Sequence, residues 1–172
     1  MYSLYCVRDW IDQDFLLLES DLTFERRAVS APLDFTRDNV VLMSGHTNAG
    51  DEVYIETHDG LLAMMSKNRG DIGDSTSGEF VGISKISLPL LRVMCEEAEL
   101  SFATGLRVSY DTDCLVAAAR RYPVYCLLVD DLAWSEIDCE SQLQNTVLRV
   151  YPRILDRDGA RQWPSRLSCR PV

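Results

Sequence analysis

The sequence predicts an α/β fold with a largely parallel sheet. Short continuous apolar runs, which are typical of strands buried on both faces, recur along the chain. Segments with apolar residues at helical spacing lie between these runs, and this alternation is the pattern of layered α/β proteins. The 172 residues, 47% of them hydrophobic, correspond to about one domain with a single core. We find no internal repeat and expect no second domain.

Each predicted strand is an apolar or β-branched run bounded by polar or turn residues. The predicted strands cover residues 14–18, 39–43, 80–86 and 124–129, and a hairpin is formed by residues 52–56 and 61–64 around Asp59-Gly60. Residues 68–78 are rich in Gly, Asp and Ser, so we expect a surface loop there.

The predicted helices have apolar residues three or four positions apart. They cover residues 2–11, 88–102, 111–121 and 141–151. Pro89 is tolerated in the first turn of its helix, and the motif Tyr110-Asp111-Thr112-Asp113 provides caps for the next one. Residues 156–172 contain four arginines and no periodicity. We therefore expect a domain over residues 1–155 and a loose tail over 156–172.

The charge balance excludes some classes of partner. There are 27 acidic and 17 basic residues, a net charge of -10, so we expect no general attraction to nucleic acid or to an anionic membrane. No apolar stretch is long enough to span a bilayer, and the N-terminus has no signal-peptide pattern. The six cysteines show no C-x-x-C spacing, which argues against a zinc site and for a reducing compartment. We expect a cytoplasmic protein.

Two carboxylates follow predicted strands or loops where α/β proteins bind ligands. Asp21 comes after the first strand, and ligands bind at the carboxyl ends of strands in open α/β sheets. Asp138 follows the segment at residues 134–137. Together they would suit Mg²⁺, which prefers oxygen ligands. The alternatives are a loop or capping role for Asp21 and an N-cap role for Asp138 in the helix that starts near Ser141.

Five short motifs, in order, resemble the nucleotidyltransferase family, in particular the phosphocholine and 2-aminoethylphosphonate cytidylyltransferases. They are FLLLESD at 15–21, SK at 66–67, GEFVGISK at 78–85, YD at 110–111 and WSEID at 134–138. The resemblance extends from Tyr2 to about Ile154. It implies a Rossmann-like, three-layer α/β/α fold. It also implies a reaction in which a phosphate or phosphonate oxygen of a small acceptor attacks the α-phosphorus of an NTP, with CTP the expected nucleotide, and displaces pyrophosphate.

The resemblance also implies roles for single residues. Asp21 and Asp138 match the family's Mg²⁺ ligands, Lys67 matches a basic residue that contacts the phosphates, and Glu79 would lie by the acceptor. An ammonium group on the acceptor would attract acidic and aromatic side chains. The candidate residues for binding this ammonium group are Tyr110, Asp111, Asp113, Trp134 and Glu136. The alternatives are a solvated hairpin end for Lys67, packing roles for the two aromatic residues and a capping role for Asp111.

The chain departs from the family in one respect. Family members begin with a strand, a Gly-rich phosphate loop and a Pro-Lys element, and the chain has no such loop. We therefore expect an N-terminally truncated version of the fold, with a sheet edge that a partner chain would cover. We consider three explanations for the missing loop. The reading frame begins at an internal methionine, the chain is a remnant of the family fold, or the chain is one half of a split enzyme. The alternative function is a non-catalytic binding module.

Overall fold

The chain folds into two compact units. The structure, a computed structural model, describes residues 1–47, 49–73 and 76–159. The first unit comprises Met1–Ser20 and Arg27–Leu132, and the second comprises Asp21–Arg26 and the residues from Ala133 onward. In the described ranges, no helix combines the length and apolar character that crossing a membrane requires.

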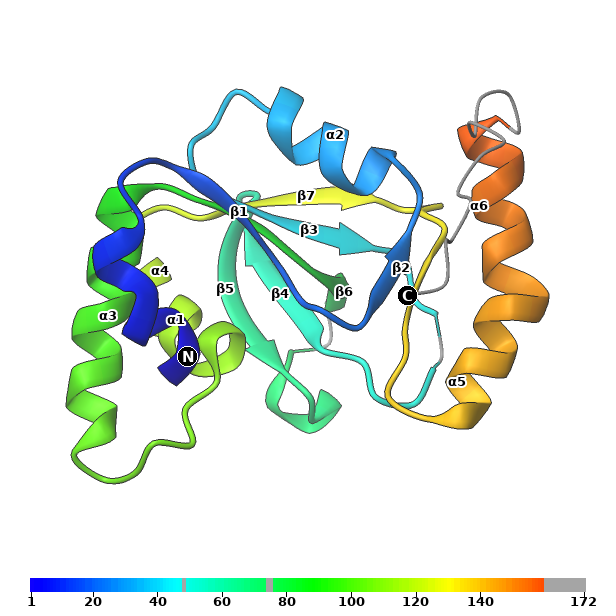
Figure 1. Cartoon of the computed structure of the whole chain (residues 1–172). Coiled ribbons are helices and arrows are strands. Elements are labelled where there is room, and N and C mark those ends of the chain that lie inside the picture. The colour runs from blue at the N-terminus through cyan, green and yellow to red at the C-terminus, as the bar shows by residue number, and fades with distance from the viewer. Residues whose placement is uncertain (48, 74–75, 160–172) are drawn as a thin grey trace, which may run out of the picture. The chain divides into compact units, whose positions relative to one another are not determined.

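The first unit is built on a six-stranded mixed sheet with the order β1-β6-β3-β7-β5-β4 (Figure 1). Its strands are β1 (Phe15–Leu18), β3 (Val40–Ser44), β4 (Tyr54–His58), β5 (Leu61–Ser66), β6 (Thr76–Ile86) and β7 (Tyr125–Val129). The pairings show that β1, β3, β4 and β7 run in one direction while β5 and β6 run in the other. Strand β6 also pairs with β4, so the strands β6, β3, β7, β5 and β4 form a closed ring of pairings.

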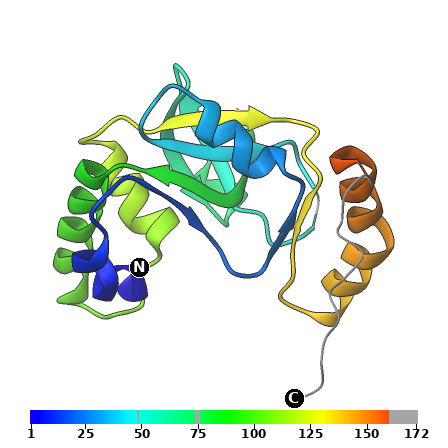
Figure 2. The ribbon, with the colours of Figure 1, turned by 45° about the horizontal axis from the view of Figure 1, so that its top comes forward.

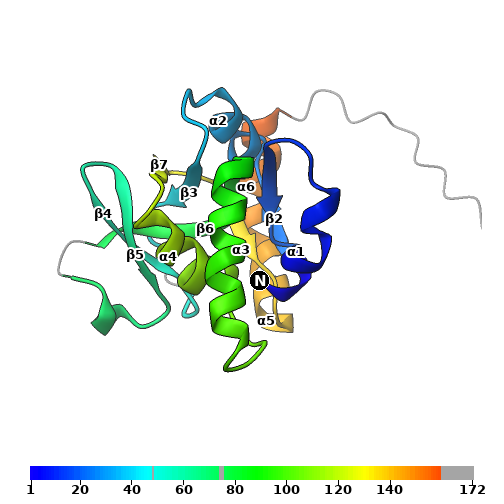
Figure 3. The ribbon, with the colours of Figure 1, turned by 90° about the vertical axis from the view of Figure 1, so that its left-hand side faces the viewer.

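Helices cover both faces of this sheet, which confirms the predicted layered α/β architecture. Helix α2 (Arg27–Asp34) contacts β3 and β6 on one face, and α1 (Tyr2–Val7), α3 (Leu88–Phe102) and α4 (Val116–Ala119) pack on the other (Figure 2). Helix α3 lies between α1 and α4 (Figure 3). The rings of Tyr2 and Tyr5 meet Phe102 edge-on at 5.5 and 5.3 Å, which attaches α1 to the end of α3.

Helix α3 has the bounds that the sequence predicts. Ser87 caps it by accepting a hydrogen bond from the N–H of Leu90, and Pro89 lies in the first turn, where its missing N–H costs nothing. The buried residues of α3 recur at helical spacing and face the sheet; they are Leu90, Leu91, Met94, Cys95 and Ala98. The largest part of the core therefore lies between α3 and the sheet.

The second unit is a two-stranded sheet and a helix that contains a π-helical turn. Strand β2 (Leu22–Phe24) pairs with β8 (Trp134–Glu136), and α5 (Glu140–Asn145) continues through a π-helical turn (Thr146–Val150) into α6 (Tyr151–Asp158). Ala133, Val150 and Ile154 form its small core. Arg157 contacts both carboxylate oxygens of the fully buried Glu25 at 3.4 Å, which ties the helix to the strand.

The structure corrects several predictions made from the sequence. Strand β1 is not buried on both faces, because three of its residues are only half-buried and Leu18 is 38% exposed. It is also an edge strand, since its strand partner in the described sheet is β6. Residues 156–158, predicted as tail, end α6, and residues 160–172 lie outside the described residues. The final helix is longer than the predicted 141–151, and α2, β2 and β8 are additional to the predicted elements.

Asp111 provides no cap: the N-cap of the π-helical turn at residues 110–115 is Ser109, and Asp113 accepts the Ser109 N–H at 2.8 Å.

Gly45 gives the first testable prediction. Its N–H donates to the carbonyl of Asp130 at 3.1 Å, and an added Cβ would lie 2.7 Å from that carbonyl oxygen and 2.6 Å from Oδ1 of Asp130. Because a backbone atom cannot rotate away, we expect Gly45→Ala to lower the free energy of unfolding by about 1–3 kcal/mol. Gly60→Ala is no clean control, since Gly60 has φ +77, whereas Gly105 has open space around it. Chemical denaturation of the Gly45→Ala and Gly105→Ala variants should therefore give clearly different midpoints; equal midpoints would refute the close approach.

Candidate active site

The carboxyl ends of β1, β3 and β7 lie at one end of the first unit's sheet, because these strands run in the same direction. The register places Ser44 opposite Glu79, Glu79 opposite Tyr54 and Tyr54 opposite Ser66. These residues form a row across β3, β6, β4 and β5, and Lys67 follows at its end. The row is at the sheet edge where α/β proteins bind ligands.

Glu79 is the most unusual group in this row. Its side chain is 1% exposed, and Oε1 accepts the Thr47 N–H at 2.8 Å and faces His46 Nδ1 at 3.5 Å. Oε2 is buried and has no hydrogen-bond partner among the described residues. Burial raises the pKa of Glu79, and the nearby Glu52 adds to this, while Thr47 and His46 act in the opposite direction.

This raised pKa makes stability depend on pH. The folded chain binds the Glu79 proton more tightly than the unfolded chain does, so this contribution to stability is present at low pH and is lost as pH rises through the folded pKa. Gln keeps the carbonyl oxygen for the Thr47 N–H and carries no charge. We therefore expect Glu79→Gln to gain thermal stability relative to the parent chain as pH rises from about 4 to 8. A stability difference that is constant over this range would contradict the buried charge.

Lys67 lies where the hairpin formed by β4 and β5 ends, and it is exposed. The turn after it is held by neighbours: Ser66 Oγ donates to Asp71 at 2.8 Å and accepts the Asn68 N–H at 3.0 Å. The backbone at Lys67 is thereby fixed while its side chain is accessible to solvent. This arrangement fits the phosphate contact that the resemblance implies, and it also fits a solvated hairpin end.

Three of the residues that the sequence predicts to bind the acceptor lie in the π-helical turn at residues 110–115. Tyr110 donates a hydrogen bond to Glu19 Oε1 at 2.9 Å, and its ring meets Phe80 at 6.4 Å. Asp111 is buried, and Asp113 is engaged by the Ser109 N–H. Glu19, which follows β1, is a residue that the sequence does not single out, although it precedes Asp21 by only two positions.

The second unit gathers three carboxylates. Strand pairing places Leu22 opposite Glu136, and the Ile137 N–H donates to the Asp21 carbonyl at 3.0 Å. As a result, carboxylate oxygens of Asp21 and Glu136 lie within 4.8 Å of each other, as do those of Glu136 and Asp138. Trp134, also proposed for the acceptor, is half-buried on the same strand, opposite Phe24.

Two pairs of these carboxylates could hold a divalent cation, Asp21 with Glu136 and Glu136 with Asp138, whereas Asp21 and Asp138 do not belong to the same group. Oδ1 of Asp21 is buried without a hydrogen-bond partner in the described part of the chain, and a buried carboxylate oxygen in that state is costly unless a cation or donor reaches it. Asp138 is not the helix N-cap, because Cys139 holds that position, and Gln142 Oε1 accepts the N–H groups of both residues. The capping alternative for Asp138 is thereby excluded. An all-oxygen set is what Mg²⁺ prefers.

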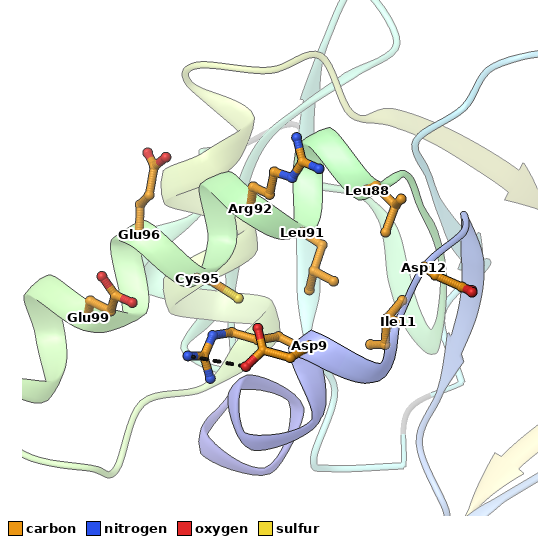
Figure 4. A pocket seen from close by; sticks show the side chains of 10 residues that line it. Asp9, Ile11, Asp12, Leu88, Leu91, Arg92, Cys95, Glu96 and Glu99 are labelled. Carbon is orange, nitrogen blue, oxygen red and sulfur yellow. Dashed lines mark ion pairs between the residues drawn. The ribbon is translucent and has the colours of Figure 1, made fainter.

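A groove of about 490 Å³ lies elsewhere in the first unit, between α3 and the 3-10 turn (Arg8–Trp10) that follows α1 (Figure 4). Leu88, Leu91 and Ile11 form its apolar part, and charged groups such as the Arg8–Asp9 pair, 3.7 Å apart, stand at its rim. It begins beside the amino end of β1, at the opposite end of that strand from Glu19. It is therefore separate from the row that contains Glu79.

Comparison with solved structures identifies the fold. The inositol-1-phosphate CTP transferase from T. maritima superposes with a TM-score of 0.61 at 14% identity, over 90% of this chain and 62% of that one. The fold is that of the nucleotidyltransferases. CTP:phosphocholine cytidylyltransferase from Streptococcus pneumoniae gives 0.59 at 16% identity over 84% of this chain and 60% of that one. UTP-bound UGPase from Acinetobacter baumannii gives 0.60 at 11% identity over 86% and 54%.

The nucleotidyltransferase fold explains the mixed sheet with helices on both faces. The chain spans between 54% and 62% of the length of the three structures named above. No known protein-family pattern matches the sequence. The comparisons thus establish the fold of the chain.

Proposed function

We propose that the chain carries the metal-binding and acceptor-binding residues of a Mg²⁺-dependent nucleotidyltransferase. In the proposed reaction, a phosphate or phosphonate oxygen of a small acceptor attacks the α-phosphorus of an NTP and pyrophosphate leaves. CTP is the proposed nucleotide, on the resemblance to cytidylyltransferases. The acceptor is a small phosphorylated amino-alcohol or an aminophosphonate.

The observation that carries this proposal is the carboxylate set of the second unit. Asp21 and Asp138 follow β1 and β8, Glu136 lies within 4.8 Å of each of them, and Oδ1 of Asp21 is buried without a partner among the described residues. In a protein with the nucleotidyltransferase fold, such a set is suited to the ion that accompanies a triphosphate. When bound, Mg²⁺ would neutralise charge on the triphosphate.

The chain's own residues would position and stabilise the reacting groups. Lys67 would contact phosphate oxygens and stabilise negative charge as it develops during transfer. Glu79 would contact the acceptor from its place in the row across the sheet. Glu136 would adjust the charge at the metal ligands, since its carboxylate adjoins both of them.

A partner for the edge of β1 is part of this proposal. The strand is a continuous apolar run, FLLL, yet β6 is its only neighbour in the described sheet. An uncovered apolar edge is a site for strand addition. We propose that a further polypeptide segment, in the same chain or in another, pairs with β1 and supplies the Gly-rich phosphate loop.

Pyrophosphate release tests the proposed function. The purified chain, alone and in an upstream-extended form, would be given Mg²⁺, CTP and one of phosphocholine, phosphoethanolamine or 2-aminoethylphosphonate. We expect acceptor-dependent release that EDTA abolishes. If neither form releases pyrophosphate with any acceptor, the chain is a non-catalytic module and the proposed function is wrong.

A further inference from the structure

The helix of the second unit carries two rows of residues spaced four positions apart, and one of these rows is uncovered. Thr146, Val150 and Ile154 form the inner row; they are buried, and Val150 and Ile154 belong to the small core of this unit. The outer row runs beside it along the continuous helix from α5 to α6 (Figure 1). Residues four apart share a face of a helix, so the outer row is one apolar stripe. Its members, each 45–56% exposed, are Leu143, Val147, Tyr151 and Leu155.

The outer row is part of an apolar surface that is large for a single helix. Leu148, which is 74% exposed, adjoins the row, and the five side chains together present roughly 500 Å² to solvent. A patch of that size is at the upper end of what monomeric proteins expose, and such patches mark interaction sites. Between Leu143 and Leu155 the charged residues are Arg149 and Arg153, which are two positions from members of the row and therefore lie on another face. The surface thus suits an uncharged, apolar partner.

The outer row is complementary to itself when two such helices run antiparallel. A two-fold axis midway between Val147 and Tyr151 places Val147 of one copy against Tyr151 of the other, and Leu143 against Leu155. The smallest side chain of the row then faces the largest, so the space between the helices is filled. Antiparallel pairing also brings opposite ends of the two helix dipoles together. The two copies would cover about 1,000 Å² in total, which is the lower limit for a specific interface.

We propose that the outer row is the interface of a homodimer, in which the helices from α5 to α6 of two copies pair antiparallel. A second copy fits this surface because it supplies an uncharged apolar row of the same length, and a two-fold interface must be self-complementary. An anionic membrane fits it poorly, since the chain has a net charge of -10. The row contains no residue assigned to the metal, the nucleotide or the acceptor. The inference therefore goes beyond the proposed function and does not depend on it.

Sedimentation equilibrium of the purified chain tests the inference without any substrate. Over chain concentrations from about 1 to 100 μM, we expect the mean mass to rise toward twice the 19.5 kDa of one chain and no further. Added salt should tighten the dimer, because an apolar contact is kept while the repulsion between two copies of charge -10 is screened. A mass of one chain at every concentration would assign the outer row to another partner and overturn the inference.

Two charged double variants test the pairing itself. One carries Val147→Glu and Tyr151→Glu, and the other carries Val147→Lys and Tyr151→Lys. Each alone should dimerise at least about a hundredfold more weakly than the parent chain, because like charges meet at the two-fold axis, whereas an equimolar mixture should form a one-to-one complex. A folding defect would not be rescued by mixing.

Leu100→Glu is the matched control, because Leu100 is an exposed leucine on α3 in the first unit, and it should leave the dimer unchanged. A dimer that persists in both double variants, or double variants that stay monomeric when mixed, would overturn the inference. A dimer that weakens equally in Leu100→Glu would place the interface elsewhere and would overturn it as well.

Discussion

Replacing Asp21 with Asn should lower nucleotidyl transfer by about 10³-fold or more, and Asp138→Asn should have a similar effect. Loss of a metal ligand removes several kcal/mol of charge stabilisation, and each 1.4 kcal/mol corresponds to about a factor of ten in rate. Asn keeps the shape of Asp but presents a weaker, neutral oxygen to the ion. The measurement is the initial rate of pyrophosphate release over a Mg²⁺ titration, in the form of the protein that shows turnover.

Asp156→Asn is the control for these variants, because Asp156 is an exposed carboxylate on α6 of the same unit. It should keep the parent rate. Without metal, Asp21→Asn should unfold at the same temperature as the parent chain or a higher one, since a buried unpaired oxygen loses its charge. Parent-like turnover in either ligand variant would remove that residue from the metal site.

Leu90→Ala should be strongly destabilising, lowering the free energy of unfolding by about 2–5 kcal/mol. Leu90 is fully buried on the face of α3 that packs on the sheet. Truncation removes apolar contacts and leaves a cavity that the surrounding core cannot close fully. In chemical denaturation followed by circular dichroism, the midpoint should shift strongly to lower denaturant.

Leu100→Ala provides the comparison within the same helix. Leu100 is 73% exposed, so the same change in chemistry removes almost no packing and should cost within about 0.5 kcal/mol. Both substitutions change helix propensity equally. The difference between their losses in free energy of unfolding therefore measures the contribution of burial. A cost below about 1 kcal/mol for Leu90→Ala would mean that α3 does not pack on the sheet through this face.

Elements that are fixed by local interactions could be predicted from the sequence. Ser87 and Pro89 define the start of α3, and the spacing of its apolar residues defines its face. Asp59 and Gly60, with φ of 53° and 77°, form the turn between β4 and β5, and both residue types tolerate this conformation. These signals lie within a few residues of the structure that they determine.

Elements that depend on distant partners could not be predicted. Strands β2 and β8 have three residues each, and they exist because Leu22 pairs with Glu136, which is far away along the chain. Strand β1 has the composition of a central strand, so the pattern could not reveal its place at an edge of the described sheet. The length of the final helix could not be predicted because its π-helical turn disturbs the apolar period.

In the candidate site, too, single residues could be predicted from the sequence, whereas contacts between distant segments could not. Asp21 and Asp138 could be singled out because each follows an apolar or strand-like segment, and Glu79 because of the family resemblance. The proximity of Glu136 to both aspartates requires the β2–β8 register. The contact of His46 with Glu79 could not be predicted either, because it depends on the loop after β3 folding back on β6.

The most direct test of nucleotidyl transfer is phosphorus NMR of the reaction mixture, because pyrophosphate release alone also accompanies hydrolysis of the nucleotide. CTP, Mg²⁺ and phosphoethanolamine would be incubated with the chain in its active form. We predict two coupled signals of a new diphosphate that links cytidine to the acceptor, together with one equivalent of pyrophosphate. Formation of CMP and pyrophosphate without that diphosphate, or no change in the spectrum, would contradict the assignment of this chain to nucleotidyl transfer.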